Sequence, residues 1–224
     1  MQRLYPSPTA PTTARDAYGV DRLPHSSGRP WIGLCMVASI DGSTVFGGTS
    51  AGLSSDADRD VLLTLRSFAD LIIVGAGTVR AEGYGAPRTP GQRIGVVSRS
   101  GTMDLDTALF SSGAGFLILP EDAPACDVDS VRAGIGEVDL AAALCSLPGN
   151  PRFVQAEGGA SLNAALAAQD LVDEINITTS PQLIGGTGAR LTTGAPPLSQ
   201  RFRLAHLLED DNFIFSRYVR AAQP

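Results

Sequence analysis

Short apolar segments recur along this chain, and segments with helical spacing separate them. Such segments favour strands that are buried on both faces, and the intervening helices favour a parallel sheet that helices cover on both sides. The predicted strands are Trp31–Ser39, Leu71–Gly75, Ile94–Ser98, Phe116–Leu119, Phe153–Ala156 and Ile175–Thr179. The predicted helices run from Ser54 or Ser55 to Phe68, from Gly77 to Glu82, from Asp139 to Leu147 and from Ser161 to Gln169. The pattern predicts an α/β fold with a mostly parallel central sheet.

The two ends of the chain differ from this alternating body. Residues 1–30 carry five prolines among small polar residues, so we expect an N-terminal arm that is partly disordered, with Tyr5 and Tyr18 available to anchor it on the body or on a partner subunit. Residues 31–224 are expected to form one domain. Near its end, Phe202–Leu208 and Phe213–Tyr218 flank Glu209–Asn212, which predicts an antiparallel hairpin with these four polar residues as its turn.

Composition excludes several classes of function. The net charge of −6 argues against a nucleic-acid-binding surface, and no apolar run approaches the roughly 20 residues of a membrane helix. The N-terminus lacks the apolar segment of a secretory signal. The three cysteines, at 35, 126 and 145, are odd in number and unpatterned, which indicates a reducing, cytoplasmic compartment. With His25 and His206 isolated, neither a metal site nor a Ser-His-Asp or Cys-His site is predicted.

Ligands of parallel sheets bind beyond the C-terminal ends of the strands, so we searched the residues that follow each strand. Asp41 follows the first strand and could orient an amine of a substrate or relay a proton, although an Asp-Gly turn would have the same sequence. Gly75–Val79 is a strand end, a glycine-containing turn and a short helix, whose free N–H groups suit a phosphate, with the Thr78 hydroxyl as a further donor.

Two further strand ends carry phosphate-binding chemistry. Ser98 and Arg99 could clamp a single phosphate, such as the 2′-phosphate of NADP, unless they form only a solvated turn. Glu157–Ser161 places two glycines before a helix, where a pyrophosphate could approach the positive helix end. Because glycine there costs conformational entropy and no packing reason is apparent in the sequence, this is the strongest single signal.

Together these motifs resemble the bacterial pyrimidine reductases of riboflavin biosynthesis, the reductase domain of RibD, which share the dihydrofolate reductase fold. The resemblance covers about residues 32–218. It rests on the order and spacing of Ser39-Ile40-Asp41-Gly42, Arg59-Asp60-Val61, Leu65-Arg66, Val74–Val79, Val97-Ser98-Arg99, Glu157-Gly158-Gly159, Leu171–Glu174 and Pro181–Gly186.

The resemblance implies a homodimer that uses NADPH to reduce 5-amino-6-(5-phosphoribosylamino)uracil, or a similar pyrimidine, from a ribosylamino to a ribitylamino compound. Asp41 and Glu157 would line the reacting cleft as catalytic residues. The residues that would bind the cofactor are Ala38, Gly75, Gly77, Thr78, Val79, Ser98, Arg99, Gly158, Gly159, Ala160 and Ser161.

The sequence departs from the family on the substrate side. Ser43 stands where the family often has Lys, and Arg80–Tyr84 replaces an Asp-Asp-Pro segment. Glu82 could then replace an acid, Tyr84 could stack on a heterocycle, and Arg59 or Arg88 could bind a substrate phosphate. These departures motivate one alternative, reduction of a dihydrofolate-like pterin. A non-catalytic NADPH-binding protein is another. The zinc signature of the deaminase domain in the bifunctional relatives is absent from this sequence.

Overall fold

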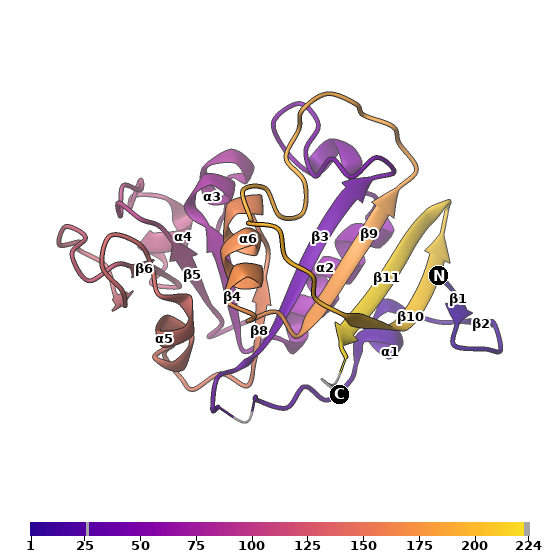
Figure 1. The fold of residues 1–224 in the computed structure, drawn as a ribbon, viewed down its shortest axis with the longest axis horizontal. Helices are drawn as coiled ribbons and strands as arrows, with labels where there is room; N and C mark the ends of the chain where they lie inside the picture. The colour runs from indigo at the N-terminus through magenta and orange to yellow at the C-terminus, as the bar shows by residue number, and fades with distance from the viewer. Residues whose placement is uncertain (26, 222–224) are drawn as a thin grey trace.

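A computed structural model describes residues 1–25 and 27–221 and places eleven strands of these residues in one sheet (Figure 1). Across the sheet the order is β2-β1-β10-β11-β9-β3-β8-β4-β5-β6-β7. The strands are β1 (Gln2–Tyr5), β2 (Ala10–Pro11), β3 (Trp31–Ser39), β4 (Leu71–Gly75), β5 (Arg93–Val97), β6 (Gly115–Leu119), β7 (Ser130–Arg132), β8 (Phe153–Ala156), β9 (Glu174–Ser180), β10 (Phe202–Asp210) and β11 (Phe213–Arg220).

The sheet is parallel in its larger part and antiparallel at one side. Strands from β9 through β3, β8, β4, β5 and β6 to β7 pair in parallel, whereas β11, β10, β1 and β2 continue the sheet with antiparallel pairs. This confirms the predicted α/β class with its mostly parallel sheet and terminal antiparallel strands. The C-terminal ends of β8 and β4 lie next to each other, with Ala156 in register with Ile73. Strand β3 pairs with β8 only up to Leu34 and continues past the end of β8 to Ser39.

Helices cover both faces of the sheet. They are α1 (Ala14–Tyr18), α2 (Asp56–Phe68), α3 (Ala76–Glu82), α4 (Ala108–Ser111), α5 (Leu140–Cys145) and α6 (Ala160–Ala168), with a 3-10 turn at Ala51–Leu53. The side chains of Ile72 and Ile73 point to opposite faces of the sheet. Ile73 packs in the core beneath α5 and α6, and Ile72 packs in the core beneath α3 and α4. In Figure 1, α6 lies in front of the sheet and α2 behind it. No helix within residues 1–25 and 27–221 is long and apolar enough to cross a membrane.

The C-terminal hairpin has a shorter turn than the sequence predicted. Strand β10 continues through Asp210 and β11 begins at Phe213, which leaves two turn residues instead of the four expected at 209–212. Asp211 and Asn212 both have positive φ, of 46° and 67°. Two such residues match the right-handed twist of the flanking strands, and Asp and Asn tolerate this conformation better than most residues.

The N-terminal segment packs on the rest of the chain with Tyr18 as an anchor, which is one of the two arrangements that the sequence left open. Strand β1 pairs with β10, and α1 packs on α2. Tyr18 is buried and meets the ring of His206 edge-on, at 4.6 Å between ring centroids, whereas Tyr5 is exposed. Farther along, the Arg22 guanidinium makes two hydrogen bonds to the buried Glu174 carboxylate. Buried side chains therefore hold the segment in place. Its many prolines favour an irregular chain and give no sign of these contacts in the sequence.

Candidate functional site

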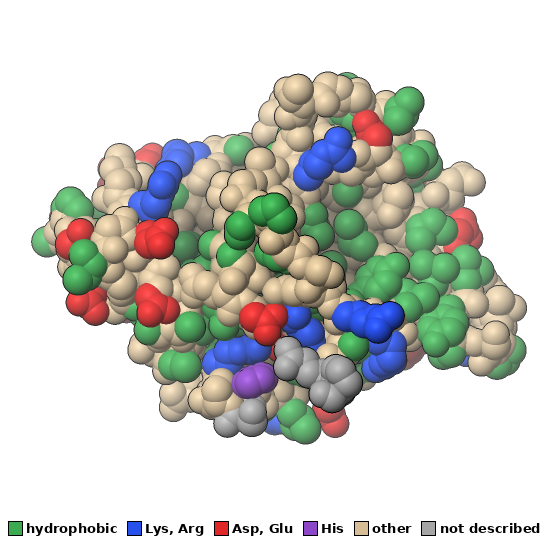
Figure 2. All heavy atoms as spheres, in the orientation of Figure 1, with side chains coloured by type: hydrophobic (Ala, Val, Ile, Leu, Met, Phe, Trp, Pro, Cys, Tyr) green, Lys and Arg blue, Asp and Glu red, His purple; other side chains and the backbone are tan. Residues whose placement is uncertain are grey.

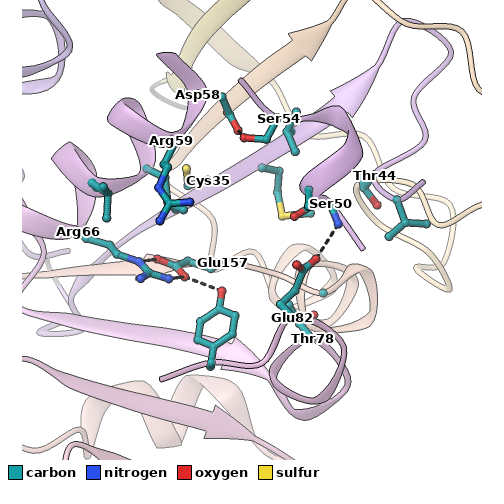
Figure 3. A pocket seen from close by; sticks show the side chains of 18 of the residues that line it. Cys35, Thr44, Ser50, Ser54, Asp58, Arg59, Arg66, Thr78, Glu82 and Glu157 are labelled. Carbon is teal, nitrogen blue, oxygen red and sulfur yellow. Dashed lines mark hydrogen bonds and ion pairs between the residues drawn. The ribbon is translucent and has the colours of Figure 1, made fainter. Parts of the chain in front are cut away.

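A cavity of about 670 Å³ opens beyond the C-terminal end of β8, beside Cys35–Val37 of β3, on the face of the sheet that α2 covers (Figure 3). Its walls come from six places in the chain: Cys35–Val37 of β3, the segment from Thr44 to Ala51, the stretch from Ser54 along α2 to Arg66, the stretch from Thr78 to Arg88, Glu157–Ala160, and Ala189. A single cavity thus brings together segments that are far apart in the sequence, as the strand-end argument predicted.

Two glycine-containing turns touch each other at one end of this cavity. The Gly75 N–H donates to the Gly158 carbonyl oxygen at 2.6 Å. A Cβ on Gly159 would lie 2.6 Å from Thr78 Oγ1, and a Cβ on Gly158, whose φ is +82°, would lie 2.9 Å from Met36 Sδ. Close packing against Thr78 therefore requires glycine at 159, and the positive φ favours glycine at 158. This corrects the premise that they have no packing reason, although it leaves the helix end behind them free for a ligand.

The N-terminus of α6 is open beside these turns. Gly159 occupies the capping position, and no side chain bonds to the first N–H groups of the helix. Ala160 lines the cavity and Ser161 is exposed. Free N–H groups at a helix N-terminus form an anion-binding site, so this end of the cavity suits a phosphate.

The other predicted cofactor residues lie in several environments. Thr78 and Gly159 line the cavity, and the space above Gly77 is open to at least 4 Å. Ala38 and Val79 are buried, which leaves their backbone as the part that a ligand could reach. Beyond the neighbouring strand β5, Ser98 is buried and accepts a hydrogen bond from the Gly101 N–H at 3.1 Å. Arg99 is exposed and has no partner within the described residues.

Glu157 is held by four hydrogen bonds at the floor of the cavity. Arg66 donates from Nε and Nη2 at 2.7 and 2.5 Å, Gln155 donates at 2.9 Å, and the Tyr84 hydroxyl donates at 2.7 Å. Burial, together with the adjacent Glu157 carboxylate, raises the pKa of Tyr84 well above its usual range. Glu157, paired with Arg66, therefore forms the floor of the cavity, and its hydrogen bond holds the Tyr84 hydroxyl group beside the cavity.

Asp41, the other predicted catalytic residue, does not line the cavity. Its carboxylate accepts hydrogen bonds from the Ser39 hydroxyl and from the Ile184 and Gly185 N–H groups, at 2.6, 3.2 and 2.7 Å. The Ser39 hydroxyl and then these N–H groups lower the pKa of Asp41 to about 2. Asp41 therefore remains ionised at neutral pH and anchors the segment after β9.

Ser43, where the family often has Lys, also turns away from the cavity. Its hydroxyl donates to the Val45 carbonyl oxygen at 2.8 Å, beneath Gly188. Ser43 therefore does not line the cavity, in contrast to its predicted place on the substrate side. The backbone of the neighbouring Thr44 pairs with Ala189, and both residues line the cavity. The segment after β9 therefore contributes a wall of the site through Ala189.

The remaining predicted substrate residues all line the cavity. Glu82 accepts a hydrogen bond from the Ser50 N–H at 2.7 Å, and Tyr84 packs beside Arg66. Arg59 and Arg88 are exposed and make no ion pair or hydrogen bond within the described residues. Two unpaired guanidinium groups at one cavity are suited to a phosphate.

Sequence reasoning missed Arg66 and Asp58 as site residues. Arg66 appeared only as part of a family motif, and its partner Glu157 is 91 residues away. Asp58 lies in the first turn of α2, where an acidic side chain is common because it favours the positive helix end, yet it lines the cavity together with Ser54. Four-residue spacing along α2 places Asp58, Leu62 and Arg66 on one face of the helix, which was the available signal.

Comparison with known proteins agrees with this geometry. The family model described as the RibD C-terminal domain matches residues 30–215. A 2,5-diamino-6-ribosylamino-4(3H)-pyrimidinone 5′-phosphate reductase of Methanothermobacter thermautotrophicus is 29% identical over 178 residues, which cover 72% of this chain and 82% of that protein. The riboflavin biosynthesis protein RibD of Chlamydia trachomatis is 29% identical over 185 residues, and this chain spans about half of its length, 48%.

Solved structures place the fold in the same group. A pyrimidine reductase-like protein from Corynebacterium diphtheriae superposes with a TM-score of 0.79 at 24% identity, over 95% of this chain and 100% of that one. Dihydrofolate reductase of Enterococcus faecalis superposes with a TM-score of 0.53 at 11% identity, over 86% of this chain and 97% of that one. The fold is therefore dihydrofolate reductase-like, and the chain belongs to the RibD C-terminal domain family.

Proposed function

We propose that this protein is an NADPH-dependent reductase that converts a 6-ribosylamino-pyrimidine 5′-phosphate into its ribitylamino product. The observation that carries the proposal is the composition of the cavity. An open helix N-terminus beside two glycine turns lies at one end, and the unpaired Arg59 and Arg88 contribute to its other walls. The M. thermautotrophicus relative is named as a reductase of such a compound, which supports the same substrate class.

The residues present fit a dinucleotide phosphate. The first N–H groups of α6 and the Thr78 hydroxyl would hold the pyrophosphate, and the open space above Gly77 would admit it. Arg99, exposed at the end of β5, would pair with the 2′-phosphate that distinguishes NADPH from NADH. NADPH would supply the hydride, while the chain positions both reactants and their charges.

The chain's own residues would hold the substrate from the opposite side. Arg59 and Arg88 would pair with its phosphate, and the Tyr84 ring would pack on its heterocycle. Reduction also takes up a proton. Glu157 remains our predicted group for this proton, because it borders the cavity and shares the Tyr84 hydroxyl hydrogen bond. The geometry of Asp41 supports a role in holding the segment after β9 instead.

Titration calorimetry with NADPH and NADH, followed by an assay of NADPH oxidation with the pyrimidine phosphate, tests the proposal. We expect NADPH to bind more tightly than NADH, and substrate-dependent oxidation to follow. Arg99→Ala should weaken NADPH much more than NADH, since only NADPH carries the 2′-phosphate. Arg93→Ala, at the other end of β5, is the control. Binding of neither nucleotide would refute the reductase proposal, and binding without turnover would favour a non-catalytic binding protein.

A homodimer and a cytoplasmic location are further parts of this proposal. The dimer is supported by family membership, and light scattering on the purified chain tests it: a mass near 23 kDa would contradict it and twice that mass would support it. The three cysteines are all unpaired, which supports a reducing compartment.

A further inference from the structure

Asp58 presents an incompletely used carboxylate to the cavity. It lies in the first turn of α2, where its backbone N–H donates to Oγ of the capping residue Ser55 at 3.2 Å. Its side chain turns toward Ser54, whose hydroxyl donates to Oδ2 at 2.5 Å (Figure 3). Within the described residues no other hydrogen bond reaches this carboxylate, so Oδ1 and a second lone pair on Oδ2 remain free to accept.

Asp58 shares the cavity with apolar side chains. Cys35, Met36 and Leu62 line the same cavity and provide apolar walls. Burial raises the pKa of the Cys35 thiol well above its usual range, and the negative charge of Asp58 adds to this effect. A carboxylate beside apolar walls favours a ligand edge that carries hydrogen-bond donors, because an acceptor facing it would be repelled and left unpaired.

The other carboxylates of the cavity are less suited to this task. Glu157 already accepts four hydrogen bonds within the chain. Glu82 accepts one hydrogen bond, from the Ser50 N–H, as Asp58 does from Ser54, but of these two carboxylates only Asp58 is among the charges that act on Cys35 of the apolar wall. Asp56 lines the rim and is exposed to water, where a hydrogen bond to a ligand gains little over one to solvent. Asp58 is therefore the acceptor that can discriminate between rings.

We propose that Asp58, oriented by Ser54, selects a pyrimidine that still carries an amino group at position 2 over the corresponding uracil. The inference rests on the proposed function and specifies the substrate class of the same site. A 2-amino-4(3H)-pyrimidinone offers two adjacent donors, the 2-amino group and N3–H, which match the two oxygens of a carboxylate. A uracil presents the O2 carbonyl in place of the amino group, and this oxygen would face the carboxylate.

The substitution Asp58→Asn tests this pairing because it exchanges one acceptor for a donor. An asparagine side chain can accept from N3–H and donate to O2, so it matches the uracil edge. Asp56→Asn, in the same turn of α2, removes an equal charge from the cavity rim and is the matched control. The assay compares kcat/KM for the 2-amino and uracil forms of the 6-ribosylamino-pyrimidine 5′-phosphate. Calorimetry with the two ribitylamino products gives Kd ratios that need no turnover.

We expect the wild-type chain and Asp56→Asn to favour the 2-amino form by about tenfold or more, as is typical when a mismatched ring leaves a buried polar group unpaired. Asp58→Asn should abolish or invert that ratio in both measurements. Equal Kd values for the two products, or a ratio unchanged in Asp58→Asn, would overturn the inference while leaving the reductase proposal intact. Selective binding of the 2-amino product without turnover would support the inference and refute the reductase proposal.

Dihydrofolate carries the same ring edge without the ribose phosphate. Its reduction in place of the phosphate substrate would assign Asp58 to a pterin.

Discussion

At the scale of single residues, the Arg66–Glu157 pair decides what the floor of the site can do. Glu157 is almost fully buried, and its charge is compensated by two hydrogen bonds from one guanidinium group. Such a pair adds little stability compared with an apolar replacement, yet loss of one partner leaves a buried charge without compensation. The pair is therefore best understood as the contact that holds the Glu157 side chain in place beneath the cavity.

This reasoning predicts an asymmetric result from mutation. Arg66→Met should lower the free energy of unfolding by about 3 kcal/mol, the usual cost of a buried charge left unpaired. Tyr84→Phe, which removes one hydrogen bond to the same carboxylate, should cost only about 1 kcal/mol. Urea unfolding measures both. The double variant Arg66→Met with Glu157→Gln should recover part of the loss, and a loss in the double variant equal to the sum of the single losses would contradict the coupling.

At the scale of elements, the turns after β4 and β8 combine a packing requirement with a binding site. Thr78 and Gly159 lie so close that a single methyl group would clash, whereas Gly77, one residue earlier, has open space above it. The same pair of turns therefore contains one glycine that the fold requires and one that it does not. Gly77, the glycine that the fold does not require, lies where we propose that the cofactor phosphates bind.

Alanine substitutions separate these two roles. Gly159→Ala should destabilise the fold by roughly 1–3 kcal/mol through overpacking, and Thr78→Ala in the same chain should restore part of the loss. Gly77→Ala should stabilise α3 by up to about 1 kcal/mol, because alanine is the better helix former, while weakening NADPH binding. Thermal unfolding and calorimetry measure the two effects. A Gly77→Ala chain that binds NADPH as well as the wild type would remove this turn from the cofactor site.

Helices and strands could be predicted from the sequence better than the contacts between them. The apolar segments 71–75 and 116–119 coincide with strands β4 and β6, whose side chains lie in the core. A strand that is buried on both faces needs a continuous apolar segment, and such a segment is visible in the sequence. The four residues of β1 carry no such signal, since their pairing with β10 bridges about 200 positions. The contact between Gly159 and Thr78 and the ion pair of Arg66 with Glu157 likewise depend on strand order, which single positions do not encode.

At the scale of the whole molecule, a polar cluster lies beneath α1 where an apolar core would be expected. Glu174 is fully buried and accepts hydrogen bonds from Arg22 and Arg217, which hold its pKa at about 2 against the effect of burial. Across the strands, His206 pairs in register with Arg217 and packs against Tyr18. The N-terminal segment and the C-terminal hairpin are joined through this cluster, so its ionisation affects the entire fold.

His206 should therefore set the pH dependence of stability in the weakly acidic range. Burial and then the charge of Arg217 lower its pKa from 6.5 to about 4, so the unfolded chain binds a proton between these values and the folded chain does not. The free energy of unfolding should thus change little just above pH 6.5 and fall below pH 6.5 by up to about 1.4 kcal/mol per pH unit. Urea midpoints at a series of pH values measure this slope. His206→Gln should flatten it between pH 6.5 and 5, above the range in which Glu174 titrates, whereas His25→Gln, which alters an exposed histidine, should leave it unchanged. A slope that persists in His206→Gln would place the titrating group elsewhere in the molecule.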